Sequence, residues 1–347
     1  MANVQQRIES IKENMQRRKK GLMNLIPFYT HFPRLSKFIP GLFRQGIYKI
    51  LSGTGVGKSK LARFMSVVIP YELSKTSNIK FHTLFFALEE SKEEFIDSMI
   101  LTMLYKHHGI KMDRLTLNSY FQNPLDEGIL EKIVGVQSYV EDIMTHVTVF
   151  DDIRNPTGIY KACEEFSKTR GKHHMKKIKL GESYVTVQDR YEADDEEEFI
   201  IVVVDHISLL QSEYSSLLRK SLSKRECMEL WNDNYCSRIS NKWNWITLNI
   251  QQTAMSSDDV SHQKANRLEP ELSDAGDNKT ILRTDKVIFA LFDPSRYGLK
   301  TYNGINIAAL GDNFRAMKIL KNRYGISNRT VPLFFEGASG RFNELKT

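Results

Sequence analysis

Short apolar runs alternate with longer helix-like patterns from residue 46 to the end of the chain. Short buried runs, bounded by turn residues and rich in branched and aromatic side chains, are typical of strands. Because helix-length segments separate many of these runs, the pattern predicts parallel strands with helices packed on both faces of the sheet. The predicted fold is an α/β three-layer domain with a mostly parallel sheet. The candidate strands are residues 46–51, 81–88, 146–150, 199–204, 244–250, 286–292, 315–320 and 331–335.

The first 20 residues have a different pattern. Val4, Ile8, Ile11 and Met15 recur at a spacing that places them on one face of a helix, with basic residues around them. Such a helix needs a surface to pack on, either in its own domain or in a neighbouring subunit; a frayed basic tail is the alternative. We divide the chain into an N-terminal helix and linker, residues 1–39, and one α/β domain, residues 40–347.

The alternation lapses between residues 170 and 198, where a basic stretch is followed by an acidic run that ends at Glu198. We interpret this charged segment as an inserted surface hairpin or loop. His173 and His174 raise the possibility of a metal site, but no matching ligands lie nearby in the sequence. An exposed basic turn is the preferred interpretation.

Composition and charge limit the possible location and partners of the protein. The chain has 347 residues, a formal charge of +7 and three cysteines, Cys163, Cys227 and Cys236. The cysteine spacing suits neither a disulfide framework nor a zinc site, which favours a reducing, cytoplasmic location, or the host cytoplasm for a viral protein. No apolar run has the length of a membrane span or a signal peptide. The positive charge is compatible with a polyanionic partner, but both signs are abundant, so charge alone does not decide the question.

The candidate chemistry begins after the first predicted strand, with Gly53-Thr54-Gly55-Val56-Gly57-Lys58-Ser59-Lys60. A glycine-rich turn, Gly-Lys-Ser and a following helix form a phosphate-binding P-loop. In such a loop backbone N–H groups surround the phosphates, Lys58 neutralises the β- and γ-phosphate oxygens, and the Ser59 hydroxyl binds Mg²⁺. The sequence therefore predicts a nucleotide-binding protein that uses ATP and Mg²⁺.

Two carboxylates follow other predicted strands. Asp205 ends the β-branched run 199–204, where a P-loop protein places the acid that holds Mg²⁺ and its waters. Glu89 follows the strand that comes after the P-loop helix and is a candidate for orienting or deprotonating the attacking water. A solvated glutamate at a helix start is the alternative for Glu89, and more so for Glu90.

The order and spacing of these motifs resemble the DnaB-type replicative helicases, whose motor domain has the RecA-like fold. Residues 86–89 resemble the family's strand with its catalytic glutamate, and 204–210 resemble its Walker B motif. Residues 245–252 are similar to its sensor strand, 271–276 to its fourth motif, and 317–325 to the strand that carries a Lys-x-Arg pair into the neighbouring subunit's ATP site.

The resemblance covers about residues 40 to 345 and implies further roles. Gln251, with Gln252 adjacent, matches the glutamine that senses the γ-phosphate. Arg323 matches the arginine finger, and Lys321 its companion. A finger supplied by a neighbour makes hydrolysis depend on assembly. The implied homo-oligomer is a hexamer.

Four features depart from the family pattern. Ser52 replaces the first P-loop glycine, Ala87 stands where serine is common, and the 170–198 segment is extra. The family's N-terminal, primase-associated domain is absent, which leaves a primase or a loader as a possible partner only.

In the RecA-like ring, the loops after the Walker B and sensor strands face a central channel. These loops correspond to residues 211–225 and 253–283, and their cations are suited to single-stranded DNA phosphates. The candidates are Arg219, Lys220, Lys224, Arg225, Lys264 and Arg267.

These observations predict an ATP-dependent helicase that forms a ring and moves along single-stranded DNA, 5′ to 3′ by the family resemblance. A RecA-like recombinase or recombination mediator is one alternative. A nucleotide-gated DNA-binding or loading protein without motor activity is the other.

Overall fold

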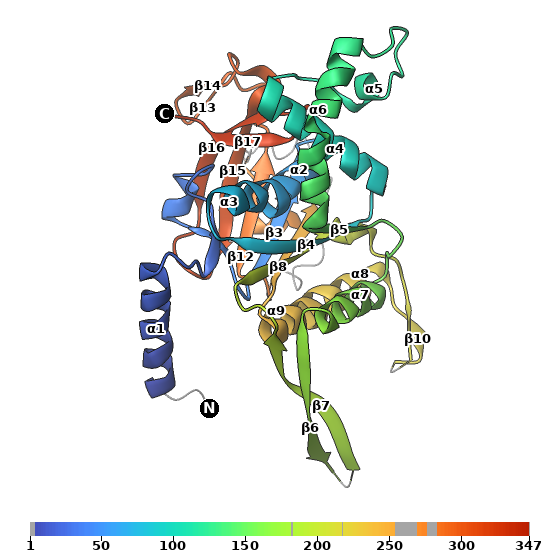
Figure 1. Cartoon of the computed structure of the whole chain (residues 1–347). Coiled ribbons are helices and arrows are strands. Elements are labelled where there is room, and N and C mark those ends of the chain that lie inside the picture. The colour runs from blue at the N-terminus through green and yellow to red at the C-terminus, as the bar shows by residue number, and fades with distance from the viewer. Residues whose placement is uncertain (1–3, 182, 217, 254–268, 276–282, 347) are drawn as a thin grey trace.

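The computed structural model describes residues 4–181, 183–216, 218–253, 269–275 and 283–346 (Figure 1). The helices are α1 Val4–Lys19, α2 Lys58–Arg63, α3 Ile69–Thr76, α4 Lys92–His108, α5 Arg114–Leu117, α6 Glu127–Thr145, α7 Pro156–Lys168, α8 Lys224–Glu229 and α9 Ser237–Trp243. The strands are β1 Leu25–Pro27, β2 Gly41–Phe43, β3 Ile47–Ser52, β4 Lys80–Ala87, β5 Val147–Phe150, β6 Gly171–Leu180, β7 Ser183–Ala193, β8 Glu198–Asp205, β9 Tyr214–Ser215, β10 Lys220–Ser221, β11 Ile246–Gln252, β12 Val287–Phe292, β13 Thr301–Tyr302, β14 Ile305–Asn306, β15 Phe314–Asn322, β16 Arg329–Glu336 and β17 Arg341–Glu344.

A central sheet organises the described residues. Its strand order is β17-β16-β15-β12-β3-β11-β8-β4-β5. The strands from β12 to β5 are parallel to one another, whereas β15, β16 and β17 pair antiparallel at one edge. All eight predicted strands belong to this sheet, and the predicted mostly parallel α/β fold is confirmed. The runs at 315–320 and 331–335 are antiparallel to each other because a short turn, with no crossover helix, joins β15 to β16.

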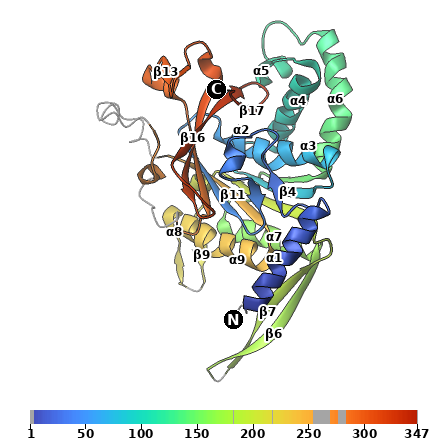
Figure 2. The same ribbon diagram turned by 90° about the vertical axis from the view of Figure 1, so that its left-hand side faces the viewer.

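Helices cover both faces of the sheet and make three layers (Figures 1 and 2). One core cluster joins β-strand residues such as Ile50 and Phe85 to α2, α3, α4 and α6. A second cluster lies on the other face and joins residues such as Leu51 and Val202 to α7, α8 and α9. The alternation of side chains along each buried strand, with a period of two, divides the apolar residues between the two clusters.

The P-loop helix changes its winding once. The chain from Lys58 to Thr76 passes from α2 through a π-helical turn, Phe64–Val68, into α3. Pro70, in the first turn of α3, has no N–H for the carbonyl of Ser66. The Thr83 hydroxyl donates to that carbonyl at 2.7 Å. The P-loop helix is thereby fixed to β4, the strand that precedes Glu89.

Two segments project from the domain at the same end (Figures 1 and 2). Strands β6 and β7 form an antiparallel hairpin within the segment 170–198. Helix α1 also projects there, apart from the hairpin in Figure 1, and Arg17 near its end forms an ion pair at 2.7 Å with Glu197, between β7 and β8. Val4, Ile8, Ile11 and Met15 are 75%, 48%, 53% and 50% exposed, so within this single chain their face of α1 packs against little of the protein.

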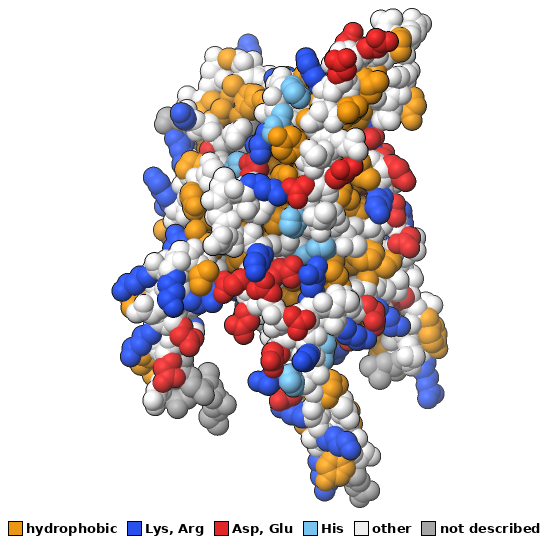
Figure 3. All heavy atoms as spheres, in the orientation of Figure 1, with side chains coloured by type: hydrophobic (Ala, Val, Ile, Leu, Met, Phe, Trp, Pro, Cys, Tyr) orange, Lys and Arg blue, Asp and Glu red, His pale blue; other side chains and the backbone are white. Residues whose placement is uncertain are grey.

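Basic and acidic side chains are interspersed on the face drawn in Figure 3. On this face, therefore, the positive charge of the chain is not gathered into one patch. None of the helices in the described ranges has both the length and the apolar character that crossing a bilayer requires.

Candidate nucleotide-binding site

The P-loop lies between β3 and α2, at the carboxyl ends of the parallel strands. Gly55 and Gly57 have φ angles of 72° and 110°, in the left-handed region that glycine adopts without strain. A Cβ atom on Gly57 would also lie 3.0 Å from the Phe335 ring. Ser52, in place of the usual first glycine, is fully buried at the end of β3 and needs no such conformation. The departure at Ser52 is therefore compatible with the loop.

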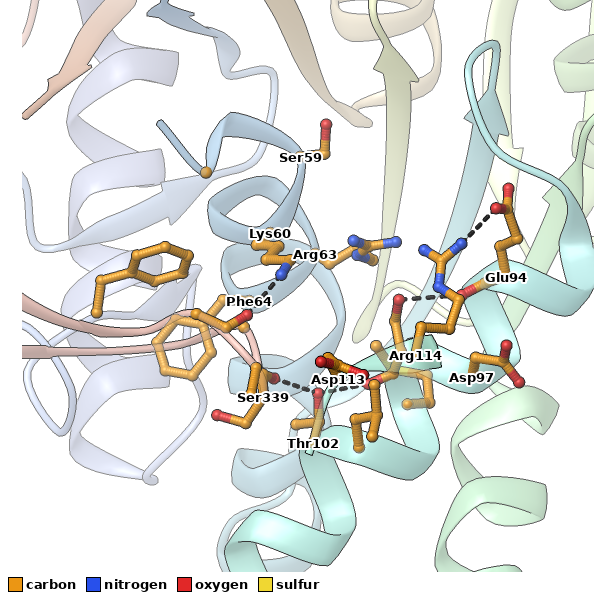
Figure 4. A pocket seen from close by; sticks show the side chains of 18 of the residues that line it. Ser59, Lys60, Arg63, Phe64, Glu94, Asp97, Thr102, Asp113, Arg114 and Ser339 are labelled. Carbon is orange, nitrogen blue, oxygen red and sulfur yellow. Dashed lines mark hydrogen bonds and ion pairs between the residues drawn. The ribbon is translucent and has the colours of Figure 1, made fainter. Parts of the chain in front are cut away.

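Lys58 and Ser59 open the P-loop helix, and the Lys58 side chain is 7% exposed. Lys60 points elsewhere: its amine donates to the Gly337 carbonyl in the turn between β16 and β17 (Figure 4). Burial, with a smaller effect of the neighbouring Arg63, lowers the pKa of Lys60. Lys60 can therefore serve a phosphate through its backbone N–H, while its side chain anchors the turn.

Asp205 lies at the end of β8, beside Ala87 at the end of β4. Its side chain is 2% exposed, and burial raises the pKa of Asp205 to about 6, against the opposing effect of a hydrogen bond with Ser59. Among the described residues, no group hydrogen-bonds its Oδ1 atom. A buried carboxylate oxygen without a donor, next to the P-loop serine, fits a site for a divalent cation.

Glu89 and Glu90 are adjacent but differ in their surroundings. Glu90 forms an ion pair with Arg63 of the P-loop helix and lies 3.8 Å from a guanidinium nitrogen of Arg114. Glu89 is 56% exposed, and its nearest ion-pair partner, His206, is 3.8 Å away. Burial lowers the pKa of His206, which favours the neutral imidazole. The Glu89 carboxylate thus remains accessible to a water, whereas Glu90 fixes α2 to the start of α4.

The two glutamines at the end of β11 face opposite sides of the sheet. Gln251 is 2% exposed and shares its face with Asn249. The Gln252 amide donates to the Thr54 hydroxyl of the P-loop at 2.6 Å. Gln252 therefore contacts the phosphate-binding loop, and Gln251, the candidate sensor, lies on the opposite face of the strand.

Two arginines that the sequence analysis did not select hold the P-loop backbone. Arg315 on β15 is 5% exposed, donates to the Val56 carbonyl at 2.8 Å, and forms an ion pair with Asp293 at 3.1 Å. Arg296 donates to the Thr54 carbonyl at 2.6 Å. Neither residue lies in a recognisable motif. The parallel pairing of β12 with β3 brings Arg296, just after β12, to the P-loop, and the antiparallel pairing of β15 with β12 brings Arg315 there.

A cavity of about 1090 Å³ extends from the P-loop along α4 and α5. Its wall opposite α4 is the turn between β16 and β17, held by Lys60 and by the Thr102 hydroxyl, which donates to the Ser339 carbonyl at 2.6 Å (Figure 4). Phe335 lines the same cavity and presents an aromatic surface beside Gly57. The cavity is large enough for a nucleoside triphosphate.

Lys321 and Arg323 lie far from this P-loop. Because β15 is antiparallel to β12, Asn322 pairs with Val287 at the start of β12, while Ser52 pairs with Leu291 near its end. About four residues of extended strand, roughly 13 Å, separate these positions, and Arg323 lies beyond the farther one. The backbone N–H of Arg323 donates to the Lys286 carbonyl at 2.9 Å. Lys321 and Arg323 thus lie at the amino ends of the parallel strands, whereas the P-loop of the same chain lies at their carboxyl ends.

The candidate DNA-binding cations are only partly described. Lys264 and Arg267 lie outside the described residues. Lys220 pairs with Glu226 at 2.5 Å and Arg225 with Glu229 at 3.2 Å, so carboxylates offset both charges. Arg219 and Lys224 are exposed.

Comparison with solved structures identifies proteins with a similar fold. The chain is similar to the ATPase domain of G40P, with a TM-score of 0.70 and 14% identity over 100% of both chains. It is also similar to a DnaB-like replicative helicase, from a structure that shows interactions with primase; the TM-score is 0.66, the identity 15%, and coverage 99% of this chain and 71% of that chain. No protein-family model matches the sequence, and no curated protein matches it. At this identity the likeness shows the fold alone, and the predicted RecA-like α/β fold is confirmed.

Proposed function

We propose that this protein is an ATP-dependent DNA helicase that assembles into a ring and hydrolyses ATP at its subunit interfaces. The observation that carries the proposal is the position of Arg323, which lies at the end of the strands opposite to the P-loop of the same chain. An arginine there cannot reach the nucleotide of its own chain, but it can reach the P-loop of a neighbour in a head-to-tail assembly, which closes into a ring when the rotation permits.

Each group near the P-loop has a role in the proposed hydrolysis. Lys58 and the loop N–H groups bind the phosphates, and Ser59 and Asp205 would hold Mg²⁺, which neutralises charge on the phosphate oxygens. Glu89 orients or deprotonates the attacking water. Arg323 of the adjacent subunit, with Lys321, stabilises the charge that develops in the transition state.

The proposed partner is single-stranded DNA, bound in the ring by the loops after β8 and β11. Arg219 and Lys224 are exposed cations of the first loop and would contact phosphates without regard to sequence. We assign 5′-to-3′ movement on the family resemblance alone. Duplexes with either a 5′ or a 3′ single-stranded tail test this assignment directly.

The decisive experiment measures steady-state ATPase activity of wild type and Arg323→Ala, with and without single-stranded DNA, over a range of protein concentrations. We expect wild-type turnover to rise with DNA and with concentration, and Arg323→Ala to lose about 10³-fold or more, because a trans arginine contributes that much to phosphoryl transfer. Arg329→Ala, an exposed arginine on the adjacent strand, is the matched control and keeps activity.

Mixing subunits tests the trans arrangement itself. Lys58→Ala subunits lack a working site but carry the finger, and Arg323→Ala subunits have the reverse defect. If hydrolysis occurs between subunits, the mixture regains activity that neither variant has alone. Activity that ignores DNA, concentration and Arg323 would instead identify a stand-alone nucleotide switch, and DNA-dependent turnover in open filaments without strand displacement would identify a recombinase.

A further inference from the structure

A completely buried ion pair joins the P-loop strand β3 to the segment just before β12. Lys49, in the middle of the apolar strand β3, and Asp285, just before β12, are both 0% exposed, and Lys49 Nζ lies 3.0 Å from Asp285 Oδ2. Lys49 shares its side of β3 with Ile47 and Leu51, which pack against the layer of α7, α8 and α9. Burial raises the pKa of Asp285, with Lys49 opposing the shift. A lysine at this place in a central strand requires an explanation beyond strand packing.

Amide side chains connect this pair to two further elements. Asn232, in the π-helical turn Leu230–Cys236, accepts from Lys49 Nζ at 3.3 Å and donates to the Thr284 hydroxyl at 2.6 Å. Asn249 of the sensor strand β11 donates to Asn232 Oδ1 at 3.4 Å and accepts from the Trp231 indole at 2.8 Å. We call Lys49, Asp285, Asn232, Asn249 and Thr284 the buried junction.

The buried junction also holds the segment that positions the finger pair. The Arg283 carbonyl, two residues before Asp285, accepts from Lys321 Nζ at 3.3 Å and from the Arg323 guanidinium. One residue after Asp285, the Lys286 carbonyl accepts from the Arg323 N–H at 2.9 Å. The buried ion pair therefore fixes residues 283–286 to the core. The backbone carbonyls of the same segment accept hydrogen bonds from Lys321 and Arg323.

The C-terminal end of each proposed DNA-binding loop leads into the buried junction. The loop 211–225 leads into α8 and the π-helical turn that contains Asn232. The loop 253–283 starts after β11, which contains Asn249, and ends directly before Thr284. At the tip of β11, Gln252 contacts Thr54 of the P-loop. The P-loop strand, the π-helical turn that follows the first loop and the segment that follows the second loop thus share one hydrogen-bonded network.

We infer that the buried junction is a positioning device that couples DNA binding in the loops to the placement of Arg323 in the neighbouring subunit's site. The inference rests on the proposed function. Burying an ion pair contributes little net stability compared with apolar side chains of similar volume. Its directional hydrogen bonds do, however, fix the relative positions of the elements that they join. A displacement at the C-terminal end of either loop is therefore transmitted to residues 283–286.

The first test replaces the pair by apolar side chains of similar size, in the double variant Lys49→Met/Asp285→Leu. Because both charges are removed together, we expect thermal stability and ATP affinity close to wild type. We expect stimulation of the ATPase by single-stranded DNA to fall about tenfold, within the usual range of coupling between sites. The control is Lys80→Met/Asp195→Leu, which removes an ion pair whose side chains are 64% and 40% exposed. A folded Lys49→Met/Asp285→Leu variant with full DNA stimulation would overturn the inference.

A subunit-mixing assay separates this inference from the proposed function. Lys58→Ala subunits that also carry Lys49→Met/Asp285→Leu are mixed with Arg323→Ala subunits, so that every finger in the productive interfaces comes from an altered junction. If the parent mixture without the junction change fails to recover, the trans mechanism is wrong and the inference fails with it. If the parent mixture recovers and the altered one recovers equally, only the inference is wrong; loss of recovery supports it.

A second variant covers the possibility that the double variant does not fold. Thr284→Val is nearly isosteric and removes the hydroxyl that accepts from Asn232 at 2.6 Å, leaving both charges in place. We expect a smaller loss of DNA stimulation in the same direction, with ATP affinity unchanged. Unchanged stimulation in a folded Thr284→Val protein would count against the junction.

Discussion

At the residue scale, the P-loop owes its shape to side chains outside its own motif. Two backbone carbonyls of the loop accept from arginines: Val56 from the buried Arg315 and Thr54 from the half-exposed Arg296. Asp293 lies near both guanidinium groups, at 3.1 Å from Arg315 and 3.6 Å from Arg296. A carbonyl held by a donor orients the next peptide, so these contacts prepare the loop N–H groups for phosphate.

We expect substitutions of the two arginines to affect different quantities, ATP affinity for Arg296 and the free energy of unfolding for Arg315. Arg296→Gln removes one hydrogen bond at a position 46% exposed; we expect ATP affinity to fall about fivefold, the equivalent of about 1 kcal/mol, with little change in stability. Arg315→Met removes the nearer guanidinium partner of the buried Asp293 and leaves only the half-exposed Arg296 at 3.6 Å, so we expect the free energy of unfolding to fall by about 3 kcal/mol. Titration with a fluorescent ATP analogue and denaturant unfolding measure the two effects. Equal effects of both substitutions on stability would contradict this assignment.

At the element scale, one carboxylate connects four segments around the P-loop helix. Glu72 on α3 accepts from Arg341 of β17 and from Lys106 of α4, both at 2.9 Å, and lies 3.0 Å from His31 Nε2. Burial alone would raise the pKa of Glu72, but the hydrogen bonds from His31, Arg341 and Lys106 hold it well below its usual value. The antiparallel edge and the N-terminal segment are thereby fixed to the layer that carries the P-loop.

The stabilisation from Glu72 depends on pH in a definite direction. Because the folded-state pKa is lowered, the contribution is fully present above the unfolded-state pKa of about 4.3 and is lost as the pH falls below it. We expect Glu72→Gln to lower the free energy of unfolding by about 3 kcal/mol at neutral pH, and the difference from wild type to shrink progressively below about pH 4. Urea unfolding at several pH values measures this. Glu131→Gln, at an exposed position on α6, should show no such dependence, and a pH-independent cost at Glu72 would argue for lost packing instead.

At the scale of the whole molecule, the single chain leaves an apolar face of α1 exposed, and Lys321 and Arg323 lie away from the P-loop of the same chain. Both features are accounted for if each subunit contacts a neighbour. Burying a large aliphatic side chain contributes about 1.5–3 kcal/mol, so a few such residues matter to assembly.

We therefore expect a charge on the apolar face of α1 to weaken assembly. Ile11→Asp places a carboxylate at a position 53% exposed in the single chain and should shift the oligomer towards smaller species at a given concentration, with loss of the concentration-dependent ATPase. Gln16→Asp adds the same charge on another face of α1 and should have little effect. Light scattering coupled to size-exclusion chromatography measures both. An unchanged oligomer in Ile11→Asp would mean that α1 packs elsewhere.

The sequence by itself determined the order of strands along the chain and the location of the P-loop between β3 and α2. Both follow from local rules: strand periodicity separates buried runs from helices, and the P-loop needs glycine, lysine and serine at fixed spacing because the phosphates are bound by consecutive residues. Asp205 and Glu89 could be selected for a related reason, since carboxyl ends of neighbouring parallel strands lie along one edge of the sheet.

Only the tertiary structure decided which residues from distant segments meet. Arg315 reaches Val56 because β15 runs antiparallel to β12, and Lys49 meets Asp285 because β3 and β12 are neighbours, facts that no local pattern encodes. The contact of Gln252 with Thr54 depends on which face of β11 Gln252 occupies, and a shift of one residue in the register would turn its side chain to the other face. Such contacts depend on strand order and register, which the packing of the whole chain sets.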